Sequence, residues 1–355
     1  MSGNSQCSPS PQGHHAKALN ADVFTMDYGV EVERISQWIR RTLSSTLHKR
    51  GVVVAISGGI DSSACAALAV KALGPKKVYG LLLPERDSQG TSSVRGKQLA
   101  EHLGIGYEQH DIAPALEALG CYRQRDEAIR RVVPAYSEHW KSKIAIAGGL
   151  EGGISYFRLI VQGPDGKQQD VRLSLSEYLQ VVAATNYKQR VRKTVEYFHA
   201  DRLNYAVTGT PNRLEYDQGF FVRNGDGSAD LKPIAHLYKT QVYAIARHLK
   251  LPESVLAAVP TTDTYSLPQG QDEFYFALPY AQMDLALWAL NQGHSAGELA
   301  ASIGITEAQA QRVLDDIQSK RRTTRTLHCV AELVEPVLHH MDTINVTAPP
   351  PAHSP

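Results

Sequence analysis

Short apolar runs alternate with helical patterns between residues 51 and 112, and this alternation constrains the fold of the chain more than any other feature. The run GVVVAIS at 51–57 is rich in valine and bounded by glycine, as expected for a buried parallel strand. Strands are predicted at 51–57, 77–85 and 105–112, with helices at 61–74 and 92–104. This β-α-β-α-β order predicts an α/β fold with a doubly wound parallel sheet.

Further segments extend this core. An amphipathic pattern predicts a helix over 32–50, with Asp27 as the cap candidate if the helix starts a turn earlier. Two strand-like runs around a Gly-Pro-Asp-Gly turn predict an inserted β-hairpin at about 145–182. Another buried strand is expected at 203–210, and the C-terminal part is expected to be mainly helical.

The two ends of the chain have the composition of disordered segments. Residues 1–20 are rich in Ser, Gly, Pro and His, and residues 331–355 end in the proline-rich stretch TAPPPAHSP. A single enzyme domain is therefore expected over 21–330, after a disordered N-terminal tail; the end of a C-terminal helix and a disordered proline-rich tail are expected over 331–355.

Charge and hydropathy exclude two classes of partner. The formal net charge is +1, so no global field favours nucleic acid. A mean hydropathy of −0.28, without an apolar run of about 18 residues, predicts no membrane span. Cys7, Cys65, Cys121 and Cys329 show no CxxC spacing, and the fourteen histidines show no metal-binding spacing. Neither disulfides nor a zinc site are predicted, and a cytoplasmic location is expected.

A glycine-rich segment carries the strongest functional signal. It consists of Ser57, Gly58, Gly59, Ile60, Asp61, Ser62 and Ser63, between a predicted strand and a predicted helix. Backbone N–H groups and the helix dipole can bind an anion there, because glycine lets the main chain approach phosphate oxygens. Ser57 and Ser62 can donate hydroxyl hydrogen bonds, and Asp61 can hold a magnesium ion. The alternative is an ordinary strand–turn–helix connection with an Asp-Ser cap.

This segment resembles the pyrophosphate-binding loop of the N-type ATP pyrophosphatases, which cleave ATP between the α and β phosphates. Further motifs resemble those of one member of that group, the NAD synthetase family, in both order and spacing. They lie at 209–215, 219–227, 229–234, 237–242, 260–263 and 271–273. The resemblance covers roughly residues 30–325 outside the hairpin. It implies an adenine nucleotide alpha hydrolase-like fold, ATP as co-substrate, and Mg²⁺.

The resemblance also implies roles for individual residues. Asp61 and Glu215 match magnesium ligands, and Asp61, Arg223 and Lys239 match catalytic positions. Beyond the loop, the implied ATP-binding residues are Thr210, Thr240 and Lys320. The implied substrate-binding residues are Asn186, Arg190, Arg192, Asp226 and Asp230. Structural roles are the alternatives: a solvated loop acid, a solvated helix face, a glycine-rich turn, or a helix cap.

The implied reaction is ATP-dependent amidation of deamido-NAD (nicotinic acid adenine dinucleotide) to NAD through an acyl adenylate, with release of AMP and pyrophosphate. Few residues precede the synthetase core, so ammonia is expected to arrive free or from a separate glutaminase partner. Family members are homodimers, and a homodimer is expected here. The family carries lysine where this chain has Arg223, within an altered 222–224 stretch. A related amide synthetase for a different carboxylic acid, in a specialised pathway, is therefore the alternative.

Overall fold

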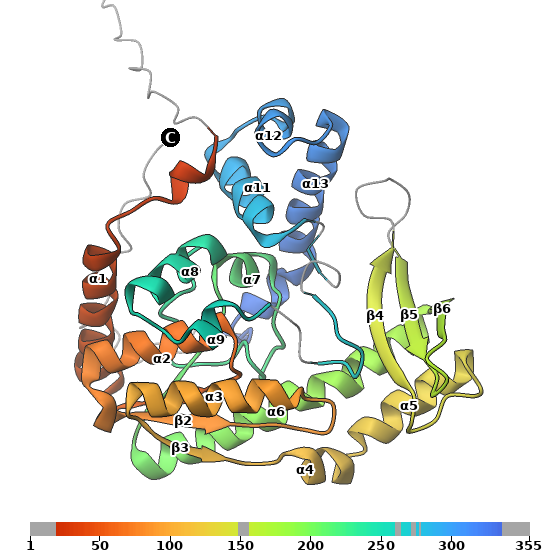
Figure 1. Cartoon of the computed structure of the whole chain (residues 1–355), viewed down its shortest axis with the longest axis horizontal. Helices are drawn as coiled ribbons and strands as arrows, with labels where there is room; N and C mark the ends of the chain where they lie inside the picture. The colour runs from red at the N-terminus through yellow and green to blue at the C-terminus, as the bar shows by residue number, and fades with distance from the viewer. Residues whose placement is uncertain (1–18, 148–155, 260–263, 271–274, 277, 336–355) are drawn as a thin grey trace, which may run out of the picture.

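The computed structural model describes residues 19–147, 156–259, 264–270, 275–276 and 278–335 (Figure 1). Its centre is a four-stranded parallel sheet in the order β3-β2-β1-β7. The strands are β1 (Val52–Ala55), β2 (Val78–Leu82), β3 (Gly106–Gln109) and β7 (Ala206–Thr208). The predicted α/β fold with a parallel sheet is confirmed.

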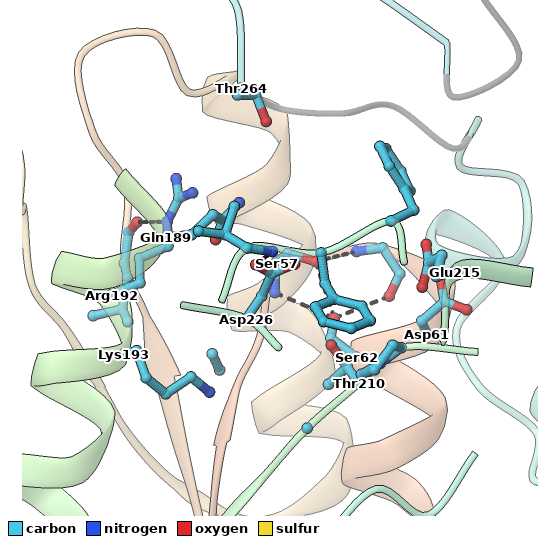
Figure 2. Close-up of a pocket in the computed structure, with 18 of the residues that line it drawn as sticks. Ser57, Asp61, Ser62, Gln189, Arg192, Lys193, Thr210, Glu215, Asp226 and Thr264 are labelled. Carbon is cyan, nitrogen blue, oxygen red and sulfur yellow. Dashed lines mark hydrogen bonds between the residues drawn. The ribbon is translucent and has the colours of Figure 1, made fainter. Parts of the chain in front are cut away.

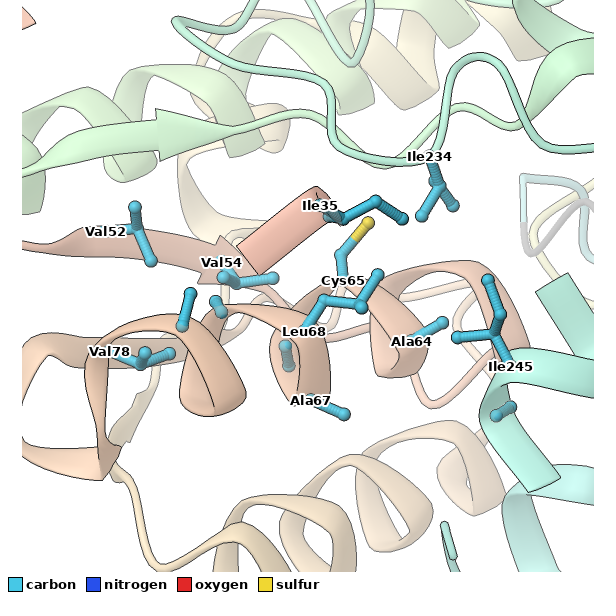
Figure 3. Packing of buried hydrophobic residues seen from close by; sticks show 14 of the residues in the cluster. Ile35, Val52, Val54, Ala64, Cys65, Ala67, Leu68, Val78, Ile234 and Ile245 are labelled. Atoms are coloured by element: carbon cyan, nitrogen blue, oxygen red, sulfur yellow. The ribbon is translucent and has the colours of Figure 1, made fainter. Parts of the chain in front are cut away.

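Helices cover both faces of this sheet. Side chains alternate from face to face along each strand, so the apolar strands present apolar side chains on both faces. Val52 and Val54 belong to the core of the first face (Figure 3). Val53, Leu81 and Val207 belong to the core of the opposite face. The first face is covered by α1 (Tyr28–Arg41), α2 (Ile60–Leu73), α3 (Gly90–Leu103), α8 (Lys239–His248) and α9 (Glu253–Leu256). The opposite face is covered by α4 (Ala113–Ala118), α5 (Cys121–Val132) and α6 (Leu175–Leu203).

Helix ends follow caps that are visible in the sequence. The helix predicted from residue 32 begins at Tyr28, and Val30 N–H donates to the side chain of Asp27 at 3.0 Å. A π-helical turn over Thr42–Leu47 continues this helix. The next helix, α2, stops at Leu73, where Gly74 takes a φ of 81° that favours glycine.

The insert differs from the predicted hairpin, because it is a three-stranded antiparallel sheet. Its strands are β4 (Lys141–Ala147), β5 (Tyr156–Gln162) and β6 (Gln168–Arg172), in that order. The predicted turn joins β5 to β6, and Gly163 N–H donates to Lys167 O at 3.0 Å. The prediction missed β4, and α6 begins inside the predicted insert. Ile144, Leu159 and Val161 are buried in a core shared with α5 and α6.

The C-terminal part is helical, as predicted. It contains α11 (Tyr280–Gln292), α12 (Ala296–Ile303) and α13 (Glu307–Thr324), which share a core with α7 (Arg213–Gln218). Short 3₁₀ helices occur at Ala21–Phe24, Pro75–Lys77 and Arg325–His328. Within the described ranges, no helix has both the length and the apolar character that crossing a membrane requires.

Some predictions fall outside the described residues. The predicted tails lie there for residues 1–18 and 336–355, as do the motifs at 260–263 and 271–273. Residues 148–155, in the predicted insert, also lie outside.

Candidate active site

A cavity of about 760 Å³ opens at the carboxyl ends of the parallel strands. Ligands of open α/β sheets bind at this edge. The basic side chains that line the cavity are Arg95, Arg190, Arg192, Lys193, Arg223, Lys239 and Lys320. The acidic ones are Asp61, Glu196, Glu215 and Asp226. Cations outnumber acids in this lining, so the cavity suits a polyanionic ligand.

The glycine-rich loop forms the floor of the cavity, between β1 and α2. The Ser57 and Ser62 hydroxyl groups lie 3.1 Å apart, and Gly59 N–H donates to Ser57 Oγ at 3.3 Å. Gly58 has a φ of +77°, and a Cβ there would lie 2.4 Å from Ser92 O. Only glycine fits at this position without displacing α3. The loop is therefore held in shape by its own hydroxyl groups and by close contact with α3.

Asp61, at the start of α2, is held by two residues far away in the sequence. Lys239 Nζ donates to Asp61 Oδ2, and Asn212 Nδ2 donates to Asp61 Oδ1 at 2.9 Å. Asn212 also caps α7, where its backbone N–H donates to Glu215 Oε2 at 3.1 Å. Figure 2 shows Asp61 and Glu215 on the same side of the cavity. One capping residue therefore positions both carboxylates.

Lys239 is a buried cation, with its side chain 2% exposed. Burial by itself lowers the pKa of Lys239, but the Asp61 and Glu215 carboxylates outweigh burial and raise that pKa above its usual value. Lys239 is consequently charged at neutral pH, and it reaches the glycine-rich loop from the start of α8.

Helix α6 forms the opposite wall (Figure 2). Arg192 Nε donates to Leu83 O at 3.1 Å, which joins this wall to the end of β2. Lys193 and Glu196 form a buried ion pair at 2.7 Å. Burial raises the pKa of both Glu196 and Asp226, although the Lys193 ammonium opposes the shift. A raised pKa disfavours the charged form of Glu196 and Asp226. These two acids therefore reduce the positive charge of the wall less than exposed carboxylates would.

The segments around residues 223 and 320 close the cavity on the C-terminal side. Arg223 Nη1 donates to Thr326 O at 3.3 Å, while Arg190 Nε donates to Arg223 O at 3.3 Å. Lys320 Nζ lies 4.4 Å from the centroid of the Tyr275 ring and 2.6 Å from Asp316 Oδ2. Burial lowers the pKa of Lys320. Arg223 and Lys320 are therefore tied to the protein and still reach the cavity.

Most of the site residues proposed from the sequence line this one cavity. They are Ser57, Gly59, Ile60, Asp61, Ser62, Asn186, Arg190, Arg192, Thr210, Glu215, Arg223, Asp226, Lys239 and Lys320.

Four proposed site residues are not in the cavity lining, and their polar groups have partners within the protein. Thr240 Oγ1 donates to Asp284 Oδ2 at 2.6 Å, so this threonine binds the side chain that caps α8. Asp230 Oδ2 accepts from Val207 N–H at 2.7 Å, and Ser63 Oγ donates to Gly59 O at 2.7 Å. Gly58 packs against α3. In this structure these four residues contact other parts of the protein next to the cavity.

Sequence reasoning missed a group of residues that follow β2. Ser88, Ser92 and Arg95 line the cavity, and Arg95 Nε donates to Gly58 O at 3.3 Å. Their signal was the serine-rich stretch after the second predicted strand, at the same edge of the sheet.

The sequence also did not reveal a buried ion network between α6 and the segment after β2. Lys188 is 1% exposed, and its Nζ donates to Glu85 at 2.9 Å and to Asp87 at 2.7 Å. It also donates to Thr264 O at 2.8 Å. Lys188 therefore ties α6 to the segment after β2 and to the chain at residue 264. No sequence pattern identifies it, because its partners are far away in the chain.

A parallel sheet with a glycine-rich loop at its carboxyl edge, opening into a cationic cavity, defines an α/β nucleotide-binding protein. The NAD synthase family model matches residues 31–135 and 165–326. The chain belongs to the NAD synthase family. The match is interrupted over much of the inserted sheet.

Curated relatives agree with this assignment. The chain is 55% identical over 320 residues to the NH(3)-dependent NAD(+) synthetase of Rhizobium meliloti (strain 1021), covering 90% of this chain and 96% of the relative. It is 34% identical over 261 residues to the enzyme of the same name from Thermotoga neapolitana, covering 73% of this chain and 84% of the relative. Among solved structures, the NH3-dependent NAD synthetase of Campylobacter jejuni matches with a TM-score of 0.57 and 21% identity. That match covers 87% of this chain and 100% of the other, and it supports the fold.

Proposed function

We propose that this chain amidates deamido-NAD to NAD, with ATP and ammonia as co-substrates. The reaction forms a carbon–nitrogen bond and releases AMP and pyrophosphate. The observation that carries the proposal is the geometry of 57–63: a glycine-rich loop, with Asp61 anchored by Lys239, at the edge of a cationic cavity. The relatives that share most of this chain are named as ammonia-dependent NAD synthetases.

Residues 57–63 are proposed to bind the β and γ phosphates of ATP. The loop precedes α2, so the positive end of the helix dipole points toward a bound anion. Lys239, which donates to Asp61, and Arg95, which donates to Gly58 O, add positive charge to the cavity beside the loop. Thr210, at the end of β7, is proposed to contact the adenine side of the nucleotide.

Asp61 and Glu215 are the proposed ligands of Mg²⁺. Both offer carboxylate oxygens at the cavity wall, and hard oxygen donors are what Mg²⁺ prefers. When bound, the ion neutralises charge on the phosphates and on the leaving pyrophosphate. The chain's own contribution is to orient the carboxylates: Asn212 holds Asp61, and its backbone N–H holds Glu215.

The acid substrate is proposed to lie along α6. Asn186, Arg190 and Arg192 line that wall, and the arginines can pair with its pyrophosphate. A carboxylate oxygen of the nicotinate ring attacks the α phosphorus of ATP, which forms an acyl adenylate and expels pyrophosphate. Ammonia then attacks the acyl carbon, which gives the carboxamide and releases AMP. Lys239, Arg223 and Lys320 supply fixed positive charge where negative charge develops.

A homodimer is also proposed, with ammonia taken free or from a separate glutaminase. Three apolar side chains on α6 are exposed in the single chain: Leu175 at 72%, Leu179 at 53% and Phe198 at 62%. Contiguous apolar patches mark protein–protein interfaces, and Leu175 and Leu179, one helical turn apart, are the proposed contribution of α6 to the dimer contact. Light scattering after size-exclusion chromatography should give the molar mass of two chains for the wild type. Leu179→Ser should shift the measured molar mass toward that of a single chain. A single-chain mass for the wild type contradicts the dimer.

The decisive experiment measures product formation by the purified protein with ATP, Mg²⁺, ammonium and deamido-NAD. NAD, AMP and pyrophosphate should appear in equal amounts, and omission of any one component should stop the reaction. Nicotinic acid mononucleotide, which lacks the adenylate half, serves as the competing acid. Preferential turnover of that mononucleotide contradicts the proposed substrate.

A paired variant tests the proposed metal ligand. Asp61→Asn should abolish turnover, whereas Asp165→Asn, in the turn between β5 and β6, should leave it unchanged. Equal activity of Asp61→Asn and the wild type contradicts the role given to Asp61.

A further inference from the structure

Three metal-ligating side chains converge on the face of the sheet that α6 covers. Glu108 lies in the edge strand β3, His110 follows that strand, and His199 lies in α6. One ligand atom from each lies within 4.8 Å of the other two. His199 Nε2 is 3.0 Å from His110 Nε2, which is 2.8 Å from Glu108 Oε1. None of the three belongs to the lining of the cavity described above.

The fold explains why these residues meet. Glu108 and His110 are two positions apart in extended chain, so their side chains lie on the same face of the sheet. Glu108 is in register with Leu81, which belongs to the core under α6. His199 projects from α6 toward this face, and its side chain is 2% exposed. A Glu-x-His pair on a strand and a histidine on a distant helix therefore form one cluster.

While Arg202 donates to His199 Nδ1, no placement of protons satisfies every contact of this cluster. His199 Nδ1 accepts from Arg202 Nε at 3.0 Å, and arginine can only donate, so the neutral His199 ring carries its proton on Nε2. That N–H points at His110 Nε2, which must then present a lone pair. The lone pair of His110 Nε2 also faces Glu108 Oε1, which is another acceptor. If His110 Nε2 carries a proton instead, two N–H groups face each other.

We propose that Glu108, His110 and His199 bind a divalent cation of the zinc class. Two imidazole nitrogens and one carboxylate oxygen are a donor set for Zn²⁺ and similar transition ions, in contrast to the all-oxygen set preferred by Mg²⁺. Ligand atoms about 2.0–2.1 Å from a tetrahedral ion lie about 3.3 Å apart. The observed 3.0 and 2.8 Å separations need to open by a few tenths of an ångström, and the third pair of ligand atoms, which lies within 4.8 Å, must come to the same spacing.

The surroundings of the cluster leave room for the ion and support its ligands. Glu108 and His110 have side chains 43% and 36% exposed, so an ion and its remaining water can approach from solvent. Tyr79 Oη donates to Glu108 Oε2 at 3.0 Å, which orients the carboxylate while its other oxygen faces the histidines. Such outer hydrogen bonds hold ligands in place at metal sites. A bound ion would link β3 to α6.

Arg202 is the group that opposes the ion. A metal on His199 Nε2 requires the proton on Nδ1, where the Arg202 guanidinium now donates. Arg202 is 39% exposed, so it can swing into solvent. Its removal should therefore strengthen metal binding, which a purely structural hydrogen-bond cluster does not predict.

Zinc titration of the full chain tests the site, with excess Mg²⁺ present to occupy the proposed Asp61 and Glu215 site. Competition with a chromophoric chelator should show one tight Zn²⁺ equivalent per chain. Glu108→Gln and His110→Gln should each weaken it at least about 10-fold, since even outer-shell changes cost that much. Both residues are partly exposed, so these variants should fold. His139→Gln, with a side chain 77% exposed, is the matched control and should bind like the wild type.

Two further measurements distinguish a metal site from a hydrogen-bonded cluster. Co²⁺ in place of Zn²⁺ should give the visible absorption of a tetrahedral site, absent in His110→Gln. Arg202→Gln should bind Zn²⁺ more tightly than the wild type. Zinc affinity that is the same in the wild type, Glu108→Gln and His110→Gln overturns the proposal, as does the absence of a tight equivalent in the wild type.

Discussion

Replacement of Lys239 by methionine should destabilise the protein, because it leaves the Asp61 carboxylate without its cation. The side chains of Lys239 and Asp61 are 2% and 16% exposed, so water replaces the lost partner poorly. Removal of one partner of a buried ion pair costs about 3–5 kcal/mol. Asp61 keeps its 2.9 Å hydrogen bond from Asn212 and some contact with water. We therefore expect the lower end, a loss of about 3 kcal/mol in the free energy of unfolding.

The double variant separates the ion pair from the side chains that form it. Asp61→Asn alone keeps the shape of the side chain but leaves the buried Lys239 ammonium without its ion-pair partner, so it too should cost about 3 kcal/mol. Lys239→Met with Asp61→Asn contains neither charge of the pair. Its loss should be smaller than the sum of the single losses by about 2–3 kcal/mol.

Urea unfolding followed by circular dichroism, in magnesium-free buffer, gives these free energies. All variants must be compared at one protein concentration, because the stability of an oligomer depends on it. The surface pair Arg40 and Glu33, with side chains 44% and 49% exposed, provides the control. Arg40→Met should change stability little, since water solvates the remaining carboxylate. Losses that add to within about 0.5 kcal/mol for the Lys239 and Asp61 variants contradict a stabilising ion pair between these two side chains.

Three further predictions concern the surroundings of the site. Gly58→Ala should lower thermal stability and raise the KM for ATP, because φ of +77° costs alanine about 1–2 kcal/mol and its Cβ would meet a carbonyl oxygen of α3. The control Gly166→Ala, at φ of +79° in open space, should show the stability loss without the change in KM. A KM for ATP that is the same in Gly58→Ala and the wild type contradicts the role proposed for the loop. Burial raises the pKa of Asp284 to about 6 despite the facing Lys239 ammonium, so the folded state favours the protonated form of Asp284. The free energy of unfolding should therefore fall by up to about 3 kcal/mol as pH rises from about 4 to 6. Urea titrations of Asp284→Asn over this pH range should show a smaller change. Lys188→Met should cost about 3–5 kcal/mol by leaving the buried Glu85 carboxylate without its cation, although Asp87 keeps its ion pair with Arg125 at 2.6 Å. A midpoint in urea equal to that of the wild type contradicts the buried network.

Local chemistry explains what could be predicted from the sequence. Valine runs predict strands because β-branched side chains suit a buried sheet, and Gly74 predicts a helix end because it tolerates a backbone that other residues avoid. The glycine-rich loop could be placed between β1 and α2 for the same reason. Strand β4 was missed because its partner β5 begins only at Tyr156, and pairing with a strand further along the chain leaves no mark in either strand alone.

The sequence was enough to predict the alternating strands and helices of the parallel sheet, the position of the glycine-rich loop and the family, since these depend on residues that are close together or on motifs in a fixed order. Which side chains meet follows from the tertiary structure. Asp61 and Lys239 are 178 positions apart, and Glu85 and Lys188 are 103 apart. Likewise, only packing turned the Thr240 hydroxyl toward Asp284 and brought His110 to His199. Side-chain period and turn preference act over a few residues, whereas these contacts depend on how the whole sheet and its helices pack.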